Sequence, residues 1–332
     1  MRMAVWVPAA VLALAGPPGL AQTPAPTDDV PPAASATASP PADIDLGSAV
    51  VEALEVVAPP PGPALWKVTK GGSEVVVLGA IKPLPHSLAW DTSRVDRALD
   101  GASALLIEPK FTFGVFDLLN YKLGGMGARQ QQPLEQTLPP ALRERFVATR
   151  IAARQDAGRY GRLKPYVAAF VLVGDYREAA GLSDAKPDST VQKLAKAHHV
   201  PVRPVSEYRV ASAVKTAGPI SDAGGLSCLQ DAIDQVQVES DHAQIAAKAW
   251  AAGDLKTVRA NYGPAPLERC LEQAPNVDVI ERGTEDSTKG ILAALAKPGR
   301  TVAVVDLNFL LRPNGVLDRL KAAGAEITIP PG

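Results

Sequence analysis

The chain has 332 residues, and its 34 Lys and Arg side chains nearly balance 35 Asp and Glu, which gives a formal net charge of −1. This balance lacks the excess of positive charge that nucleic acids and anionic membranes attract. The sequence therefore predicts neither of them as a partner.

The N-terminus has the pattern of a cleavable signal peptide. Arg2 precedes an apolar stretch from Ala4 to Ala15, and Gly19, Leu20 and Ala21 form a small-residue site suited to signal peptidase. The apolar stretch is shorter than the roughly 20 residues that span a bilayer. We predict cleavage after Ala21, a periplasmic or secreted protein, and no transmembrane segment after cleavage.

Residues 22–63 are dominated by Pro, Ala, Thr, Ser and Asp. This composition offers too few large apolar side chains to offset chain entropy, so we predict a disordered linker. The segment Ile44 to Val57 is an exception that has enough apolar residues to pack on a domain. Residues 64–332 remain, and about 270 residues are near the upper size of one compact domain.

The first part of this domain predicts strands and one short helix. Apolar runs at Trp66 to Thr69 and Glu74 to Ile81 flank a Gly-rich turn, which is typical of a hairpin. Ser93 to Leu99 has the spacing of an amphipathic helix with Asp91 or Thr92 as its cap. The helix leads into an apolar strand that ends at Glu108.

The rest of the domain is mainly helical by its apolar spacing, from Val115 to Ala180 and again from Leu226 to Ala252. Strands are expected to return only at Val200 to Val205, Val302 to Val305 and Glu326 to Ile329. The order predicts an α/β (α+β) fold, with a central mixed sheet and large helical insertions near residues 113–200 and 208–298.

Cys228 and Cys270 lie in two helical segments on either side of Trp250. In an oxidising compartment a pair of cysteines is most simply a disulfide. The alternative is a pair of free or metal-binding thiols, although a zinc site would also need His partners at suitable spacing. We expect the disulfide.

The segment Leu78 to Pro85 reads Leu-Gly-Ala-Ile-Lys-Pro-Leu-Pro. It resembles the Leu-Gly-Thr-Ile-His-x-Leu-Pro segment of the TraB/GumN (TraB/PrgY/GumN) family, which is followed by a Trp, here Trp90, and a strand ending in Glu, here Glu108. The resemblance implies metal-dependent chemistry that uses the two His of paired Gly-x-x-His motifs. At the first motif, Lys82 stands where the family has His.

The second motif is altered as well. A strand at residues 301–305 and a Gly-Val-Leu helix start at Gly315 flank the place of the second Gly-x-x-His, which here reads Asp306, Leu307, Asn308 and Phe309. Further family-like positions include Glu207, Asp188, the Trp-x-x-Gly-Asp-Leu segment from Trp250 to Leu255, and Arg282 of an Arg-Asn pair whose Asn is Gly283. The resemblance thus covers nearly the whole of residues 64–330.

We expect the candidate site where the strands end, because ligand sites of α/β sheets form at the C-terminal ends of strands. Lys82 would repel a cation held by neighbouring carboxylates, and its protonated form would instead pair with Glu108. Alternatively, Lys82 binds an anion or a carbonyl group, or serves as a base with a lowered pKa. The candidate cleft residues are Lys82, Glu108, Glu207, Asp306, Asn308 and Arg282, with Glu108, His86 and Glu207 as weak metal-ligand candidates.

The sequence contains no His-Glu-x-x-His, Gly-x-Ser-x-Gly, P-loop or Gly-x-Gly-x-x-Gly pattern after a strand. We therefore predict a non-catalytic binding or accessory protein on a degenerate metallohydrolase-like scaffold, with an unknown protein or small ligand as partner. One alternative is a metal-dependent, peptidase-like hydrolase that uses carboxylates and a repositioned His86. A second is a small-anion-binding protein acting through Lys82. No cofactor is predicted, and a divalent metal is implied by the family resemblance only.

Overall fold

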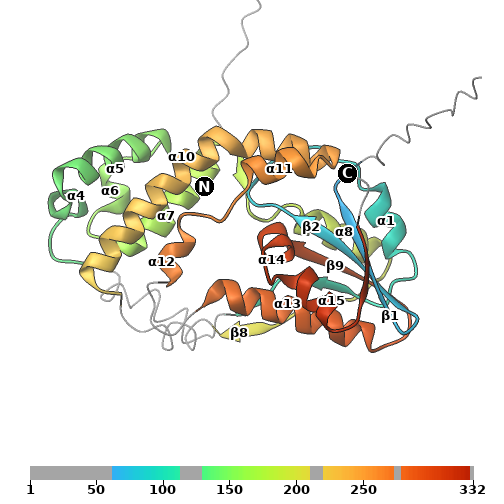
Figure 1. Cartoon of the computed structure of the whole chain (residues 1–332). Coiled ribbons are helices and arrows are strands. Elements are labelled where there is room, and N and C mark those ends of the chain that lie inside the picture. The colour runs from blue at the N-terminus through green and yellow to red at the C-terminus, as the bar shows by residue number, and fades with distance from the viewer. Residues whose placement is uncertain (1–61, 113–128, 210–219, 273–277, 330–332) are drawn as a thin grey trace, which may run out of the picture. The chain divides into compact units, whose positions relative to one another are not determined.

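The computed structural model describes residues 62–112, 129–209, 220–272 and 278–329 (Figure 1). The predicted signal peptide at 1–21 and the predicted linker up to residue 61, including Ile44 to Val57, lie outside the described residues. Gly62 and Pro63, the last residues of that linker, are buried. The Pro63 carbonyl accepts a hydrogen bond from the Arg94 guanidinium at 3.3 Å, which fixes the entry to the first strand.

A six-stranded mixed sheet forms the centre of the fold, with the strand order β10-β1-β2-β9-β4-β7. The β1 strand is antiparallel to both of its neighbours, whereas the contacts β2–β9, β9–β4 and β4–β7 are parallel. The predicted α/β fold with a central mixed sheet is therefore confirmed. Its strands are β1 (Leu65–Lys70), β2 (Ser73–Ala80), β4 (Leu105–Ile107), β7 (Val202–Pro204), β9 (Arg300–Asp306) and β10 (Glu326–Thr328).

The β1–β2 hairpin turns at Gly71 and Gly72, which have φ values of 57° and 80°. A two-residue hairpin turn with positive φ at both central positions favours glycine, because a Cβ is strained there. The strands pair from Leu65↔Leu78 to Lys70↔Ser73, so the predicted hairpin is confirmed.

The parallel pairing of β2 with β9 joins the two ends of the domain. The register runs from Glu74↔Arg300 to Ala80↔Asp306. Thr301 to Val305 are all buried, as expected for a parallel strand covered on both faces. This pairing aligns the end of β2, just before Lys82, with Asp306 at the end of β9.

Two groups of helices pack against the sheet (Figure 1). In the first group, α1 and α8 contact each other; α1 also contacts β9, and α8 contacts β4. In the second group, α13 and α15 contact each other; α13 also contacts β2 and β9, and α15 contacts β10. The short α14 follows β9 directly. These helices are α1 (Ser93–Leu99), α8 (Asp188–Ala197), α13 (Val279–Leu295), α14 (Leu307–Leu311) and α15 (Val316–Ala322).

The predicted helical insertions build a second hydrophobic core around the long helix α10 (Asp222–Ala252), which packs on α7 and α5. Gly253 ends α10 in the left-handed conformation, and Asp254 caps the next helix by accepting from the Thr257 N–H at 3.0 Å. The remaining helices are α4 (Leu134–Thr137), α5 (Pro140–Ala152), α6 (Ala157–Tyr160), α7 (Pro165–Ala179), α11 (Leu255–Asn261) and α12 (Glu268–Glu272).

Four short strands were not expected from the sequence. They form two pairs, the antiparallel β3 (Leu84–Pro85) with β6 (Leu182–Ser183), and the parallel β5 (Lys110–Thr112) with β8 (Glu207–Arg209). The prediction that strands return only at three late positions is therefore wrong. Segments of two or three residues show no periodicity, so only their tertiary partners identify them as strands.

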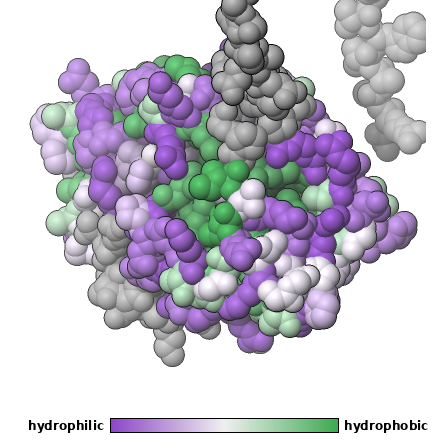
Figure 2. All heavy atoms as spheres, turned by 45° about the vertical axis from the view of Figure 1, so that its right-hand side comes forward, coloured by the Kyte–Doolittle hydropathy of each residue, from purple (hydrophilic) through white to green (hydrophobic). Residues whose placement is uncertain are grey.

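Within the described residues, no helix has the length and apolar character needed to cross a membrane. In Figure 2 hydrophilic side chains cover most of the visible face, and hydrophobic ones gather near its centre.

Cys228 of α10 and Cys270 of α12 are placed as a disulfide pair, with Cα atoms 4.6 Å apart and a sequence separation of 42. In the chain-entropy description, closing a loop of this length stabilises the fold by about 4 kcal/mol. We predict that dithiothreitol lowers the melting temperature by on the order of 10 °C. Thermal denaturation followed by circular dichroism measures this shift.

The matched control is the Cys228→Ser/Cys270→Ser double variant, whose melting temperature should already be lowered and should not respond to the reductant. Equal melting temperatures for the untreated chain and the double variant would contradict a stabilising disulfide.

Candidate active site

Three chain segments deliver charged side chains to one end of the sheet. Lys82 follows β2, Glu108 follows β4, and Asp306 ends β9. The strands are adjacent in the order β2-β9-β4 and parallel, so their C-terminal ends meet at the same edge. This is the edge at which ligand sites of α/β folds usually lie.

Lys82 is held between two carboxylates. Its Nζ donates to Glu108 Oε2 at 2.7 Å and forms a second ion pair with Asp188, the first residue of α8. Only 18% of the Lys82 side chain, 28% of Glu108 and 14% of Asp188 is exposed. The ion pairs are thus largely withdrawn from water.

The electrostatics of this group keep Lys82 positively charged. Burial lowers the pKa of Lys82, but the charges of Glu108 and Asp188 outweigh it and raise the pKa above its ordinary value. Burial likewise raises the pKa of Glu108, and the charge of Asp188 adds to this, while Lys82 opposes both effects. The shift at Lys82 is opposite to that of a lysine acting as a base.

A second group surrounds Asp306. The Tyr262 hydroxyl donates to Asp306 Oδ2 at 2.8 Å, and the Asn308 backbone N–H donates to Oδ1 at 2.7 Å. The Lys82 backbone N–H donates to the Tyr262 hydroxyl oxygen at 3.4 Å, which links the two groups. Burial and the charge of Glu108 raise the pKa of Asp306 to about 7, although both hydrogen bonds and Lys82 act against this rise.

The backbone beneath the site is tightly packed at Gly79. A Cβ there would lie 2.5 Å from Leu307 Cδ2 and 2.6 Å from Trp66 Cζ3, so a larger residue would displace the core. The Trp250 indole N–H donates to the Gly79 carbonyl at 2.7 Å and ties the end of α10 to β2. This bond gives the Trp-x-x-Gly-Asp-Leu segment a structural role.

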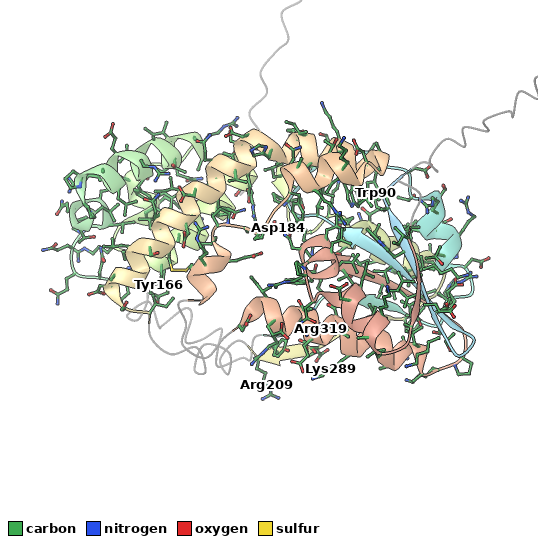
Figure 3. All side chains as sticks on the ribbon, in the orientation of Figure 1. Trp90, Tyr166, Asp184, Arg209, Lys289 and Arg319 are labelled. Carbon is green, nitrogen blue, oxygen red and sulfur yellow. A yellow bond between two sulfur atoms is a disulfide. The ribbon has the colours of Figure 1, made fainter. Side chains whose placement is uncertain are left out.

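A cavity of about 210 Å³ opens beside Lys82, Tyr262, Asp306 and Asn308. Polar side chains of the helical part line it as well. Arg177 binds Glu239 Oε2 at 3.0 Å and Asp184 Oδ1 at 2.7 Å, and Asp184 is labelled in Figure 3. The remaining polar lining residues include Gln235, His242, Asn261 and Glu268.

Two of the predicted cleft residues, Glu207 and Arg282, and the weak metal-ligand candidate His86 lie elsewhere. Glu207 is exposed on β8, opposite Lys110 of β5, and the described residues include no hydrogen bond or ion pair that joins it to Lys82, Glu108 or Asp306. The Arg282 guanidinium lies over the Tyr208 ring, 5.6 Å from its centroid. His86 is exposed, bonds through its backbone to Gly181, and does not line the cavity. Lys82, Glu108, Asp306 and Asn308 do come together.

Sequence reasoning did not assign Asp188, Tyr262 or His242 to the site. In the sequence, Asp188 is only a family-like position at a helix start, and Tyr262 follows a helix without any motif. His242 lies on a polar helix face, where solvent exposure is the simplest expectation; its Nδ1 is 2.9 Å from Asn261 Oδ1. The Trp250 to Leu255 segment was the only signal near Tyr262.

The family model for TraB/PrgY/gumN matches residues 64–329. The chain belongs to the TraB/PrgY/gumN family. No curated protein and no solved structure matches the chain.

The divalent metal implied by the TraB/PrgY/gumN resemblance does not fit the donor set of this site. The Lys82 ammonium occupies the position of the first family His and neutralises the carboxylates that would attract a cation. Asp188 Oδ1 is buried without a hydrogen-bond partner in the described part of the chain, but a single such oxygen beside an ammonium does not make a divalent site. Within the described ranges, no three His, Cys, Asp or Glu side chains are grouped to hold a metal.

At the second altered motif, an aromatic side chain packs against the core where the family has a histidine. Phe309, in place of the second family His, packs against the main core. Its ring lies over Gly283, which replaces the Asn of the family's Arg-Asn pair; a Cβ on Gly283 would be 2.8 Å from Phe309 Cε2. Two departures from the family pattern are therefore in contact, and the aromatic ring leaves no room for the missing side chain.

We predict that Lys82→Met destabilises the domain by about 3 kcal/mol, because it leaves two largely buried carboxylates facing each other without a cation. Urea denaturation measures the loss. Adding Glu108→Gln and Asp188→Asn to this variant should recover most of it.

The matched control is Lys67→Met on β1, whose ion pair with Glu74 is half exposed. It should cost less than about 1 kcal/mol. A loss for Lys82→Met no larger than for Lys67→Met would contradict a structural role for the Lys82 ion pairs.

The stability of the folded chain is expected to depend on pH through Asp306. The pKa of Asp306 is raised from its ordinary 3.8 to about 7 in the folded state. Between these two pH values the folded chain keeps a proton on Asp306 that the unfolded chain has already released. The associated stability is fully present below this window and is lost as the pH rises through about 7. We predict that the stability of the parent chain relative to Asp306→Asn falls as the pH rises from about 3.8 to about 7 and changes little above this range, as measured by urea titrations.

Tyr262→Phe provides the control, since it removes a hydrogen bond that favours ionised Asp306 and should move the window to higher pH. A stability difference that does not change with pH would contradict the raised pKa.

Proposed function

We propose that this TraB/PrgY/gumN-family protein is a non-catalytic binding or accessory protein on a degenerate metallohydrolase-like scaffold. The observation that carries the proposal is the position of Lys82 Nζ between Glu108 and Asp188. An ammonium there supplies the positive charge of a metal but has no vacant coordination position, so it neither polarises a substrate carbonyl as a Lewis acid nor activates water.

The contact between Phe309 and Gly283 supports the same proposal. Phe309, at the position of the second family His, packs against Gly283 and the main core. An apolar ring at one former ligand position and an ion-paired lysine at the other support a site that is stabilised without a metal.

The hydrolase alternative would combine these carboxylates with His86. His86 is exposed on the loop after β3, and its backbone N–H is bound to the Gly181 carbonyl at 2.8 Å. His242 lines the cavity and is the better-placed imidazole for such chemistry. Neither arrangement brings a histidine into contact with Asp306 or Glu108 in the part of the chain that the structure describes.

The alternative of small-anion binding through Lys82 requires its ammonium to face a ligand. Both ion pairs would have to be exchanged for the anion, and two like-charged carboxylates would remain beside it. The geometry therefore favours the non-catalytic role over this alternative.

We also propose that the protein is exported to the periplasm or secreted. The apolar N-terminal stretch and its small-residue cleavage site support this location. The placement of Cys228 and Cys270 supports it independently, because structural disulfides persist in oxidising compartments.

We predict that the purified chain, incubated with Mn²⁺, Co²⁺ or Zn²⁺ and then desalted, retains only substoichiometric metal. Inductively coupled plasma mass spectrometry measures the content. The physical reason is the repulsion between Lys82 and a divalent cation.

The matched variant is Glu108→Ala, which removes the carboxylate that a metal would need. Stoichiometric metal in the parent chain that disappears in Glu108→Ala would overturn the non-catalytic proposal and make peptidase assays the next step.

A further inference from the structure

An open groove runs between one side of α8 and the strand β7. Its helical wall is formed by Ser189, Gln192, Lys193 and Lys196, and its other wall by the segment from His199 to Val202. The four helical residues have the spacing i, i+3, i+4 and i+7, so they lie on one face of α8 and their side chains are neighbours. The groove shares no lining residue with the cavity at Lys82.

The groove follows a free edge of the central sheet. β7 is the last strand in the sheet order, and among the described residues it pairs only with β4. The Leu105 N–H donates to the Pro201 carbonyl at 2.9 Å, and the Val205 N–H donates to the Ile107 carbonyl at 2.9 Å. Because the backbone groups of alternate strand residues point to opposite sides, the N–H and C=O of Val202 point away from β4, toward the free edge.

The charged side chains that line the groove are all basic. Lys193, Lys196 and His199 line it, and no described Asp or Glu does. None of these three side chains has an ion pair or hydrogen bond with a described residue, whereas Lys67 on β1 is paired with Glu74. The groove therefore has a positive charge that the described part of the protein does not neutralise, and it attracts anionic groups.

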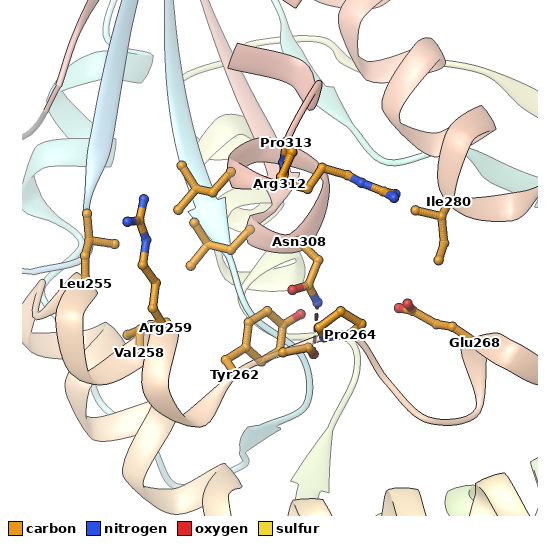
Figure 4. A pocket seen from close by; sticks show the side chains of 13 residues that line it. Leu255, Val258, Arg259, Tyr262, Pro264, Glu268, Ile280, Asn308, Arg312 and Pro313 are labelled. Atoms are coloured by element: carbon orange, nitrogen blue, oxygen red, sulfur yellow. Dashed lines mark hydrogen bonds between the residues drawn. The ribbon is translucent and has the colours of Figure 1, made fainter. Parts of the chain in front are cut away.

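The larger cavity beside the Lys82 site has no such uniform charge. It has a volume of about 660 Å³ and opens between α11, α13 and α14 (Figure 4). Arg259 and Arg312 enter it from different sides, and Glu268 lines it as well. Its lining therefore selects no single ligand charge, in contrast to the groove at α8.

The backbone position of His199 is one that usually belongs to glycine. His199 follows the C-cap residue of α8 and has a φ value of 57°, at which a Cβ is strained. The Val200 N–H donates to the Ala195 carbonyl at 2.8 Å and closes the end of the helix. Glycine would form the same turn with less strain, so the imidazole costs stability, as side chains of binding sites often do.

The groove also has an apolar part of limited length. Val202 is 38% exposed, and Pro201 beside it is exposed as well. Pro204 has no N–H to donate, so the addition of a strand at this edge cannot continue beyond Val202. A bound segment is therefore short, and its charges rather than a long backbone ladder supply most of its affinity.

We propose that the groove between α8 and β7 binds a short extended peptide segment of a partner protein that carries acidic side chains beside an apolar one. The acidic side chains contact Lys193, Lys196 and His199, and the backbone and the apolar side chain of the segment contact Val202. The inference deepens the proposed binding role and rests on it, but it uses residues outside the Lys82 network.

Fluorescence anisotropy of a fluorescein-labelled heptapeptide, Asp-Asp-Glu-Val-Glu-Asp-Asp, tests the inference on the full chain. We expect saturable binding, weaker binding when Ser replaces the Val of the peptide, and no binding when Lys replaces each of its acidic residues. A labelled octathymidylate, which is anionic but has no peptide backbone, should bind more weakly. Binding should also weaken as the salt concentration rises from about 0.02 to about 0.3 M, because salt screens exposed charges.

Lys193→Gln and Lys196→Gln should each weaken peptide binding by about threefold, and the double variant by about tenfold, as expected for the loss of exposed ion pairs. The matched control is Lys321→Gln, an exposed lysine of α15 that does not line the groove and whose loss changes the net charge equally. It should leave the affinity unchanged. His199→Gly should weaken binding while its melting temperature rises, because glycine relieves the strain at this position.

Circular dichroism melts establish that the variants remain folded, as expected for exposed side chains. Absence of binding of the acidic peptide would overturn the inference. So would equal affinities of the double variant and Lys321→Gln, or octathymidylate binding as tight as that of the peptide.

Metal content measured on the same samples separates the two proposals. Peptide binding together with stoichiometric metal would retain the peptide groove and overturn the non-catalytic role. Absence of both would retain the non-catalytic role and overturn the peptide groove.

Discussion

The parallel pairing of β2 with β9 is the constraint on which the site depends. It aligns Ala80 with Asp306, so the residues that follow β2 and those that end β9 leave the sheet at the same edge. Because both strands are buried, this edge is a rigid base. Gly79 permits Trp66 and Leu307 to close over the backbone, and the Trp250 hydrogen bond fixes the end of α10 at the same point.

The charged side chains that line the two neighbouring cavities differ in whether they have partners within the described residues. At the smaller one, Lys82 is neutralised by Glu108 and Asp188, and Arg177 by Glu239 and Asp184, so its strongest charges are satisfied within the protein. The larger cavity, of about 660 Å³, is lined by the exposed Arg259 and Arg312 and by apolar side chains that include Leu255, Val258 and Ile280. Both cavities are bordered by Tyr262, whose hydroxyl donates to Asp306, and by Asn308, whose backbone N–H donates to Asp306. The chain thus belongs to the family, while the residues at its strand ends differ from the family pattern.

The sequence predicted the parts of the site that follow strands. Lys82, Glu108 and Asp306 each end or follow an apolar run, and the rule that parallel strands end at one edge brought them together correctly, along with Asn308. The same reasoning failed for Glu207, because β7 is the edge strand and the chain after it turns away to pair with β5. Arg282 and His86 were placed by motif position, which fixes neither the direction of a side chain nor its neighbours.

Local sequence patterns by themselves predicted the hairpin and most of the helices, since turn residues and apolar periodicity act over a few neighbouring residues. The family was recognised from short motifs, such as the one from Leu78 to Pro85. Only the tertiary structure decided that Asp188 pairs with Lys82, that Tyr262 holds Asp306, and that Phe309 covers Gly283. Each of these contacts joins segments far apart in the chain. Such neighbours are set by how the helices dock on the sheet, and the docking depends on packing that no single segment contains.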